Sequence, residues 1–157
     1  MIRETNKASI LLLLLLLSSC NSDVIFTDSI VMQDNIWELF NVPDFSIQID
    51  DTTQLTDVLF TIRTGSDYPF RNLFLFVTAS SPDGNRMTDT LEYYLADEKG
   101  SWYGKGFGDI HELNLPYRTN VFFPDRGTYH FKIQHGMRIG DLPGIYDFGL
   151  RIERSKR

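Results

Sequence analysis

The feature that most constrains this sequence is a repeated alternation of apolar and polar residues with a period of two. Successive side chains of a β-strand point to opposite faces of a sheet, so this period is typical of strands with one buried and one solvated face. Beyond residue 20, no segment shows the periodicity of a long helix. Five segments alternate in this way: residues 45–50, 57–63, 90–95, 128–133 and 146–153.

Three further segments predict additional structure. Residues 73–77 are apolar throughout, which predicts a central strand covered on both faces. Residues 36–40 form either another strand or a helical turn. The less regular segment 101–123 predicts a strand near its start, a loop over residues 106–109 and a second strand near Phe122.

Turn-forming residues separate the predicted strands. They occur as Ser81-Pro82-Asp83-Gly84, Arg126-Gly127 and Leu142-Pro143-Gly144. Proline presets φ for a turn and glycine accepts a positive φ. Seven to nine short strands joined by such turns predict an all-β fold, an antiparallel β-sandwich of jelly-roll or immunoglobulin-like type. The 12 Phe, 7 Tyr and 2 Trp suit the layer between two sheets.

The start of the chain has the pattern of a secretory signal peptide. Arg3 and Lys7 precede an unbroken apolar run of eight residues, Ile10–Leu17. As a helix this run is about 12 Å long, whereas the hydrocarbon core of a bilayer is about 30 Å thick. The run is therefore too short to span a membrane and fits the apolar region of a signal peptide.

The segment Leu17-Ser18-Ser19-Cys20 resembles the bacterial lipobox, in which two small residues precede a cysteine. In lipoproteins the thiol of this cysteine receives a diacylglyceryl group, and the signal peptide is cut just before it. We expect residues 1–19 to be removed and residues 20–157 to form one domain anchored by acyl chains on Cys20. The alternative is an ordinary signal peptide followed by an unmodified cysteine.

The composition argues against several classes of function. A single cysteine excludes an intramolecular disulfide and zinc sites built on several cysteines. The net charge is −6 and no dense basic block is present, so nucleic-acid binding is not expected.

Motifs for catalysis or cofactor binding are missing from the sequence. His111, His130 and His135 form neither H-x-H nor H-E-x-x-H, and there is no G-x-S-x-G or phosphate-binding glycine motif. We therefore expect no catalytic residue, no cofactor and no metal. The alternating Gly104, Gly106 and Gly108 predict a bent or bulged strand where backbones approach closely; a flat surface with exposed aromatics is the alternative.

Several phrases follow one another in a recognisable order. They are LTDVLFTIR (55–63), YPFRNL (68–73), SPDG (81–84), GSWYGKGFGD (100–109), LPGI (142–145) and DFGLRIE (147–153). With the lipobox, their order and spacing resemble the gliding motility lipoprotein GldH family of the Bacteroidota. The resemblance extends over essentially the whole chain after Cys20.

This resemblance implies a lipid-anchored protein of the cell envelope. The family is needed for gliding in species that glide, and it is associated with machinery that is also linked to protein secretion. It has no established catalytic residues, so the resemblance implies none here. We therefore expect a non-enzymatic accessory or structural component that faces the periplasm. Its partners would be the membrane, through the acyl chains, and envelope proteins of the gliding and secretion machinery.

A membrane-tethered carbohydrate- or ligand-binding β-sandwich is the alternative function. Such modules often stack sugars on exposed aromatic side chains. Trp37, Trp102 and Tyr103 are the candidates for a ligand or partner surface. Two of them exposed and coplanar would favour this function, whereas burial of all three would argue against it.

Replacing Cys20 by alanine tests the anchor directly. We expect Cys20→Ala to abolish incorporation of labelled palmitate, because the chain contains no other thiol. The matched control is Ser22→Ala, which should be labelled normally. Palmitate labelling that persists in Cys20→Ala would refute the anchor.

Overall fold

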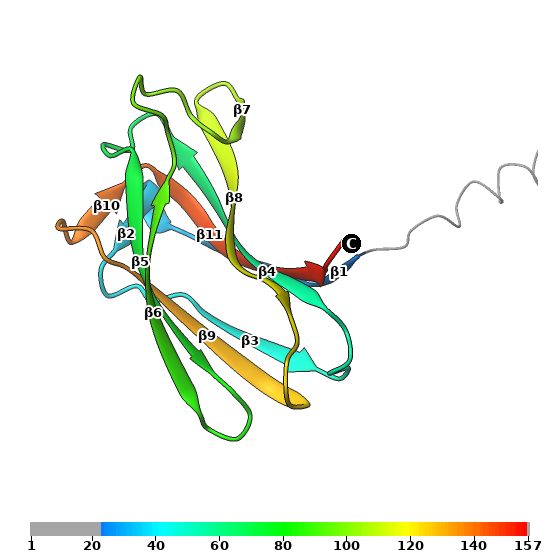
Figure 1. Cartoon of the computed structure of the whole chain (residues 1–157). Coiled ribbons are helices and arrows are strands. Elements are labelled where there is room, and N and C mark those ends of the chain that lie inside the picture. Colours follow the sequence, from blue (N-terminus) through cyan, green and yellow to red (C-terminus); the bar gives the residue numbers. More distant parts are fainter. Residues whose placement is uncertain (1–22, 157) are drawn as a thin grey trace, which may run out of the picture.

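The computed structural model describes residues 23–156, and its main architecture is two antiparallel β-sheets packed face to face (Figure 1). The first sheet has five strands in the order β1-β11-β4-β8-β7. The bounds of these strands are Val24–Val31 (β1), Ile145–Arg154 (β11), Thr56–Gly65 (β4), Ile110–Val121 (β8) and Lys105–Phe107 (β7).

The second sheet has four strands in the order β3-β9-β5-β6. Their bounds are Asp44–Ile49 (β3), Gly127–His135 (β9), Asn72–Ser80 (β5) and Arg86–Tyr94 (β6). A small ladder pairs β2 (Ile36–Glu38) with β10 (Asp141–Pro143), next to a 3₁₀ turn, Gln33–Asn35 (η1). The segment 36–40 thus begins as a strand and ends in a turn.

The predicted all-β antiparallel sandwich is confirmed. The described residues contain eleven strands rather than seven to nine. The prediction did not include β1, which has eight residues, or the three-residue strands β7 and β10, and β7 overlaps the predicted loop over residues 106–109. Three residues are too few for an alternating pattern to be recognised in the sequence.

The core lies between the two sheets and contains a row of aromatic rings. Trp37 of β2 lies 4.8 Å from Phe148 of β11, measured between ring centroids, and Phe148 lies 5.4 Å from Phe60 of β4. Phe60 stacks on Tyr117 of β8 at 5.1 Å. The first three rings have no exposed surface. The row therefore connects β2 with three adjacent strands of the first sheet.

The prediction that residues 73–77 form a strand covered on both faces is wrong. This segment lies in β5, which is central because it pairs with both β6 and β9. Leu75 is fully buried, but Phe76 is 43% exposed, so only one face of the strand is covered. A two-layer sandwich leaves the outer face of each sheet toward solvent, and β5 follows that rule despite its apolar sequence.

The segment 101–123 forms a hairpin of β7 and β8, and Phe122 lies just beyond β8. The prediction of close backbone approach at the alternating glycines is confirmed for two of them. A Cβ atom on Gly104 would lie 2.5 Å from the carbonyl oxygen of Glu112, and one on Gly106 would lie 2.5 Å from Nδ1 of His111. Only glycine fits at these two positions without displacing the neighbouring hairpin strand.

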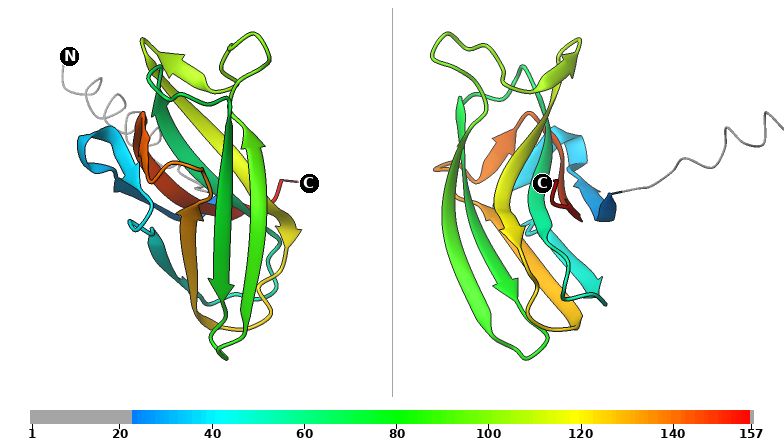
Figure 2. Two further views of the ribbon diagram at one scale, coloured as in Figure 1. Left: turned by 90° about the vertical axis from the view of Figure 1, so that its left-hand side faces the viewer. Right: turned by 45° about the vertical axis from the view of Figure 1, so that its right-hand side comes forward.

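Both ends of the described chain lie at one end of the first sheet. The backbone N–H of Arg154 donates to the carbonyl of Asp23 at 2.8 Å, and Lys156 forms an ion pair with Asp23 at 3.8 Å. In Figure 1 and in the right-hand view of Figure 2, the C-terminal end lies beside the start of β1. The β7–β8 hairpin meets the opposite end of β4, where Gly65 pairs with Ile110. Among residues 23–156 we find no helix long and apolar enough to cross a bilayer.

The aromatic row predicts where the fold is most sensitive to truncation. Phe148→Ala should lower the free energy of unfolding by about 3–5 kcal/mol, because it removes a buried ring between Trp37 and Phe60. Phe107→Ala is the control, since Phe107 is 96% exposed and its truncation should change stability by less than about 0.5 kcal/mol. Urea unfolding followed by tryptophan fluorescence measures both values. Equal effects of the two substitutions would contradict the assignment of the core.

A histidine is buried beside the same row. His135, at the end of β9, has no exposed surface, and its ring meets that of Trp37 edge-on at 5.5 Å. Neither ring nitrogen makes a hydrogen bond with a described residue. Burial lowers the pKa of His135 below its ordinary value, and this outweighs the opposing influence of the backbone at Gly140 and Trp37.

This lowered pKa predicts a loss of stability in weak acid. The unfolded chain takes up the proton near pH 6.5, whereas the folded chain does so only at lower pH. As the pH falls below about 6.5, His135 should reduce the free energy of unfolding by up to about 1.4 kcal/mol per pH unit, until the folded-state pKa is reached. Urea unfolding between pH 7.5 and 5 should show a shallower decline for His135→Leu. His130→Gln, an exposed position on β9, should behave as wild type.

Candidate functional site

The two sheets meet along an edge where β6 of the second sheet faces β8 of the first (Figure 1). We call this line the seam. Side-chain contacts cross it from Tyr93 to Pro116, from Tyr117 to Asp89, and from Arg118 to both Asp89 and Met87. Two hollows lie along the seam, one on each side of these contacts.

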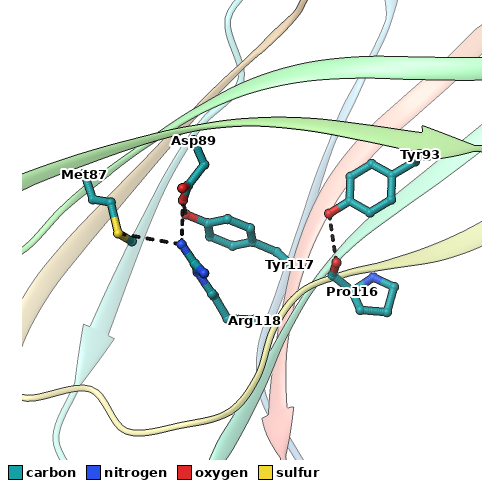
Figure 3. Close-up of polar contacts among 6 residues, drawn as sticks. All are labelled: Met87, Asp89, Tyr93, Pro116, Tyr117 and Arg118. Carbon is teal, nitrogen blue, oxygen red and sulfur yellow. Dashed lines mark hydrogen bonds and ion pairs between the residues drawn. The ribbon is translucent and has the colours of Figure 1, made fainter.

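Two of the polar contacts of the seam share one acceptor (Figure 3). The Tyr117 hydroxyl donates to Oδ2 of Asp89 at 2.7 Å, and the Arg118 guanidinium donates to the same oxygen at 2.8 Å. The sulfur of Met87 lies 3.7 Å from the Arg118 guanidinium. Burial, reinforced by the nearby Asp89 carboxylate, raises the pKa of Tyr117. Tyr117 therefore remains a hydrogen-bond donor across the physiological pH range.

A separate hydrogen bond links the two sheets farther along the seam. The Tyr93 hydroxyl donates to the carbonyl of Pro116 at 2.8 Å. Burial raises the pKa of Tyr93 to about 12, so this donor also stays protonated. Pro116 has no N–H, and with its carbonyl already bonded it offers nothing to an added strand at this edge.

The upper groove is the hollow on the side of Tyr93 nearer the β7–β8 hairpin. Its volume is about 550 Å³. Its walls include Tyr93, Tyr94, Tyr103, Lys105, Glu112 and Asn114. Tyr94 is 51% exposed and Tyr103 is 66% exposed.

The lower pocket is the hollow beyond the Asp89 contacts. It is smaller, about 230 Å³, and almost entirely apolar. Its walls include Met87, Tyr117, Val121, Phe122, Phe123 and Phe131. Met87 is 47% exposed and Phe122 is 55% exposed, so apolar surface at this pocket faces solvent.

A third hollow, the polar basin, lies on the outer face of the first sheet and has a volume of about 520 Å³. Its charged side chains are largely paired with each other: Arg63 with Asp147, and Arg151 with Glu153 at 2.8 Å. Glu112 and Asn114 line both this basin and the upper groove.

The aromatic residues predicted for a surface lie in three different environments. Trp37 is fully buried, and its indole N–H donates to the carbonyl of Asn41 at 2.7 Å, so it offers no surface to a ligand. Trp102 is half-buried and stacked on His111, with ring centroids 5.1 Å apart. Only Tyr103 presents an exposed ring. Cys20 lies outside the described residues.

The residues of the seam itself are hard to predict from the sequence. Asp89 and Arg118 lie on separate strands and meet only because the sheets pack together. The adjacent pair Tyr93 and Tyr94 was the one available signal. Neighbouring residues of a strand point to opposite faces, so one of these two tyrosines had to point outward.

Metal binding has no structural support in the described part of the chain. Within residues 23–156, no three His, Cys, Asp or Glu side chains gather closely enough to hold a metal ion. The features that remain are the aromatic upper groove, the apolar lower pocket and the polar basin.

Comparison with known proteins identifies the family. A family model described as GldH lipoprotein matches residues 24–152. A "Gliding motility lipoprotein GldH homolog" of Christiangramia forsetii is 36% identical over 149 residues, which is 90% of this chain and 91% of that protein. The "Gliding motility lipoprotein GldH" of Flavobacterium johnsoniae is 34% identical over 160 residues, covering 98% and 99% of the two chains.

Solved structures resemble the chain only distantly. A chain from the structure of infectious bursal disease virus Gx strain aligns with a TM-score of 0.36 and 14% identity, covering 83% of this chain and 30% of that one. That score is too low to support any functional argument. The family match and the two nearly full-length relatives, in contrast, show that this chain belongs to the GldH lipoprotein family.

Proposed function

We propose that this protein is a non-enzymatic accessory component of the gliding motility machinery and of the secretion machinery linked to it. The observation that carries the proposal is its similarity, over at least 90% of the chain, to two relatives named for gliding motility. In this proposal residues 1–19 are removed, acyl chains on Cys20 hold the protein to an envelope membrane, and the domain 20–157 faces the periplasm.

The proposed anchor would hold the domain close to the membrane. Three peptide steps separate Cys20 from Asp23, a reach of about 10 Å. Asp23 is in turn fastened to Arg154 by a backbone hydrogen bond and to Lys156 by an ion pair. A tether this short keeps the adjoining end of the sandwich near the lipid surface.

The lower pocket belongs to that same end of the first sheet. Val121, in its wall, pairs with Thr56, and Thr56 also pairs with Arg154. A partner that docks at the pocket would therefore itself be close to the membrane. This favours an envelope protein of the machinery over a freely diffusing one.

The chemistry of the lower pocket suits an apolar side chain of a protein partner. Met87 and Phe122 expose apolar surface that a partner would cover, with a stabilisation of about 25 cal/mol for each Å² removed from water. Apolar pockets flanked by polar groups are the usual setting of binding hot spots. Here the Asp89–Arg118 ion pair supplies the polar flank.

Photo-crosslinking in the native cell tests this proposal. A photoreactive phenylalanine analogue at position 122 should capture a discrete envelope protein, identified by mass spectrometry as a gliding or secretion component. The matched control is the same analogue at Phe40, which is 90% exposed but lies outside the lower pocket.

The outcomes separate clearly. Capture from position 122 and not from position 40 supports docking at the lower pocket. The same products from both positions, or capture of proteins unrelated to gliding or secretion, would contradict it.

A further inference from the structure

The β7 strand turns its aromatic and basic side chains toward solvent. Gly104 and Gly106 lie against β8 with no room for a Cβ atom, so they occupy the inner side of the alternation. Tyr103, Lys105 and Phe107, which alternate with them, are all exposed. The glycine spacing thus fixes an outward row of side chains beside the upper groove.

Apart from the Tyr93 hydroxyl, which donates to Pro116, and the Glu112 carboxylate, whose charge acts on Arg63, the polar side-chain groups of the upper groove have no partner among residues 23–156. Among residues 23–156, Lys105, Glu112 and Asn114 make no side-chain hydrogen bond or ion pair, and the hydroxyls of Tyr94 and Tyr103 make none either. The polar basin differs, because its arginines are already paired with carboxylates. The groove therefore offers an ammonium, a carboxylate, an amide and two phenols to a ligand.

The tyrosine rings add flat apolar surface to these polar groups. Tyr103 is 66% exposed. The guanidinium of Arg71 lies over the ring of Tyr94, 5.1 Å from its centroid. A pyranose ring has an apolar C–H face for stacking and a rim of hydroxyls that both donate and accept hydrogen bonds. That combination matches the groove.

The size and surroundings of the groove favour the same ligand class. Its volume of about 550 Å³ lies within the range of about 300–1,000 Å³ typical of ligand sites. An extended peptide is disfavoured, because β7 and Pro116 bound the open part of the β8 edge. Glu112 and Asn114 also line the polar basin, so a polymer leaving the groove would meet further hydrogen-bonding groups there.

We propose that the upper groove is an oligosaccharide-binding site, with Tyr103 and Tyr94 as its stacking residues. The site lies at the end of β4 remote from Asp23, since Glu112 pairs with Arg63 near the end of that strand. Ten residues of extended strand separate the two ends of β4 by about 30 Å. The groove thus lies away from the proposed anchor, and it shares no lining residue with the lower pocket.

The test is calorimetric titration of the purified full-length lipoprotein with defined oligosaccharides. The probes are chitotetraose, cellotetraose and xylotetraose, and the micelles are of a detergent without a sugar headgroup. We expect at least one tetrasaccharide to bind. Tyr103→Ala and Tyr94→Ala should each weaken that binding at least tenfold, whereas Tyr103→Phe should retain most of it.

The control is Phe40→Ala, which removes an exposed aromatic ring outside the groove and should bind as wild type. Binding of none of the three probes, or binding that survives both tyrosine-to-alanine substitutions, would overturn the proposal. Capture of a protein by a photoreactive residue at position 103, in the absence of saccharide binding, would overturn it in favour of a protein surface. Crosslinking from position 122 should be unaffected by Tyr103→Ala. Failure of the oligosaccharide proposal would therefore leave the docking proposal for the lower pocket standing, and the reverse also holds.

Discussion

The row of aromatic rings between the sheets is the interaction on which the rest of the structure depends. Each ring of this kind buries roughly 150–250 Å², which corresponds to about 4–6 kcal/mol before conformational entropy is deducted. The row runs from Trp37 through Phe148 and Phe60 to Tyr117. The ring of Tyr117 belongs to this row, and its hydroxyl donates a hydrogen bond to Asp89. The core therefore fixes the position of the polar contacts in the seam.

Much of the fold was predictable because half-buried strands leave a period of two in the sequence. The alternation at 45–50 and 128–133 corresponds to β3 and β9, which pair with each other. The strands β7 and β10 were missed because three residues are too few to show a period. The prediction for residues 73–77 was wrong for another reason. Phe76 is partly exposed on the solvent face of β5, and an apolar sequence does not show which of its side chains are exposed.

The candidate site was less predictable than the fold, because it is assembled by packing between sheets. Tyr94 and Glu112 line one groove although eighteen positions of the chain separate them. Trp37 was expected to be a candidate for a ligand surface because it is a tryptophan. It is instead the middle residue of β2 and faces the core. Tyr103 has an exposed ring, and its part in a ligand or partner surface stays a prediction.

The pairing of β1 with β11 has a mechanical consequence. β1 is the edge strand that follows the proposed anchor, and its pairing with β11 extends from Val24 to Val31. A pull between the anchor and the far end of the sandwich runs along this strand. The hydrogen bonds of the pair are then loaded in shear and share the force, whereas a pull across the strand would break them one after another. The first strand after the proposed anchor is thus oriented to bear tension along its length.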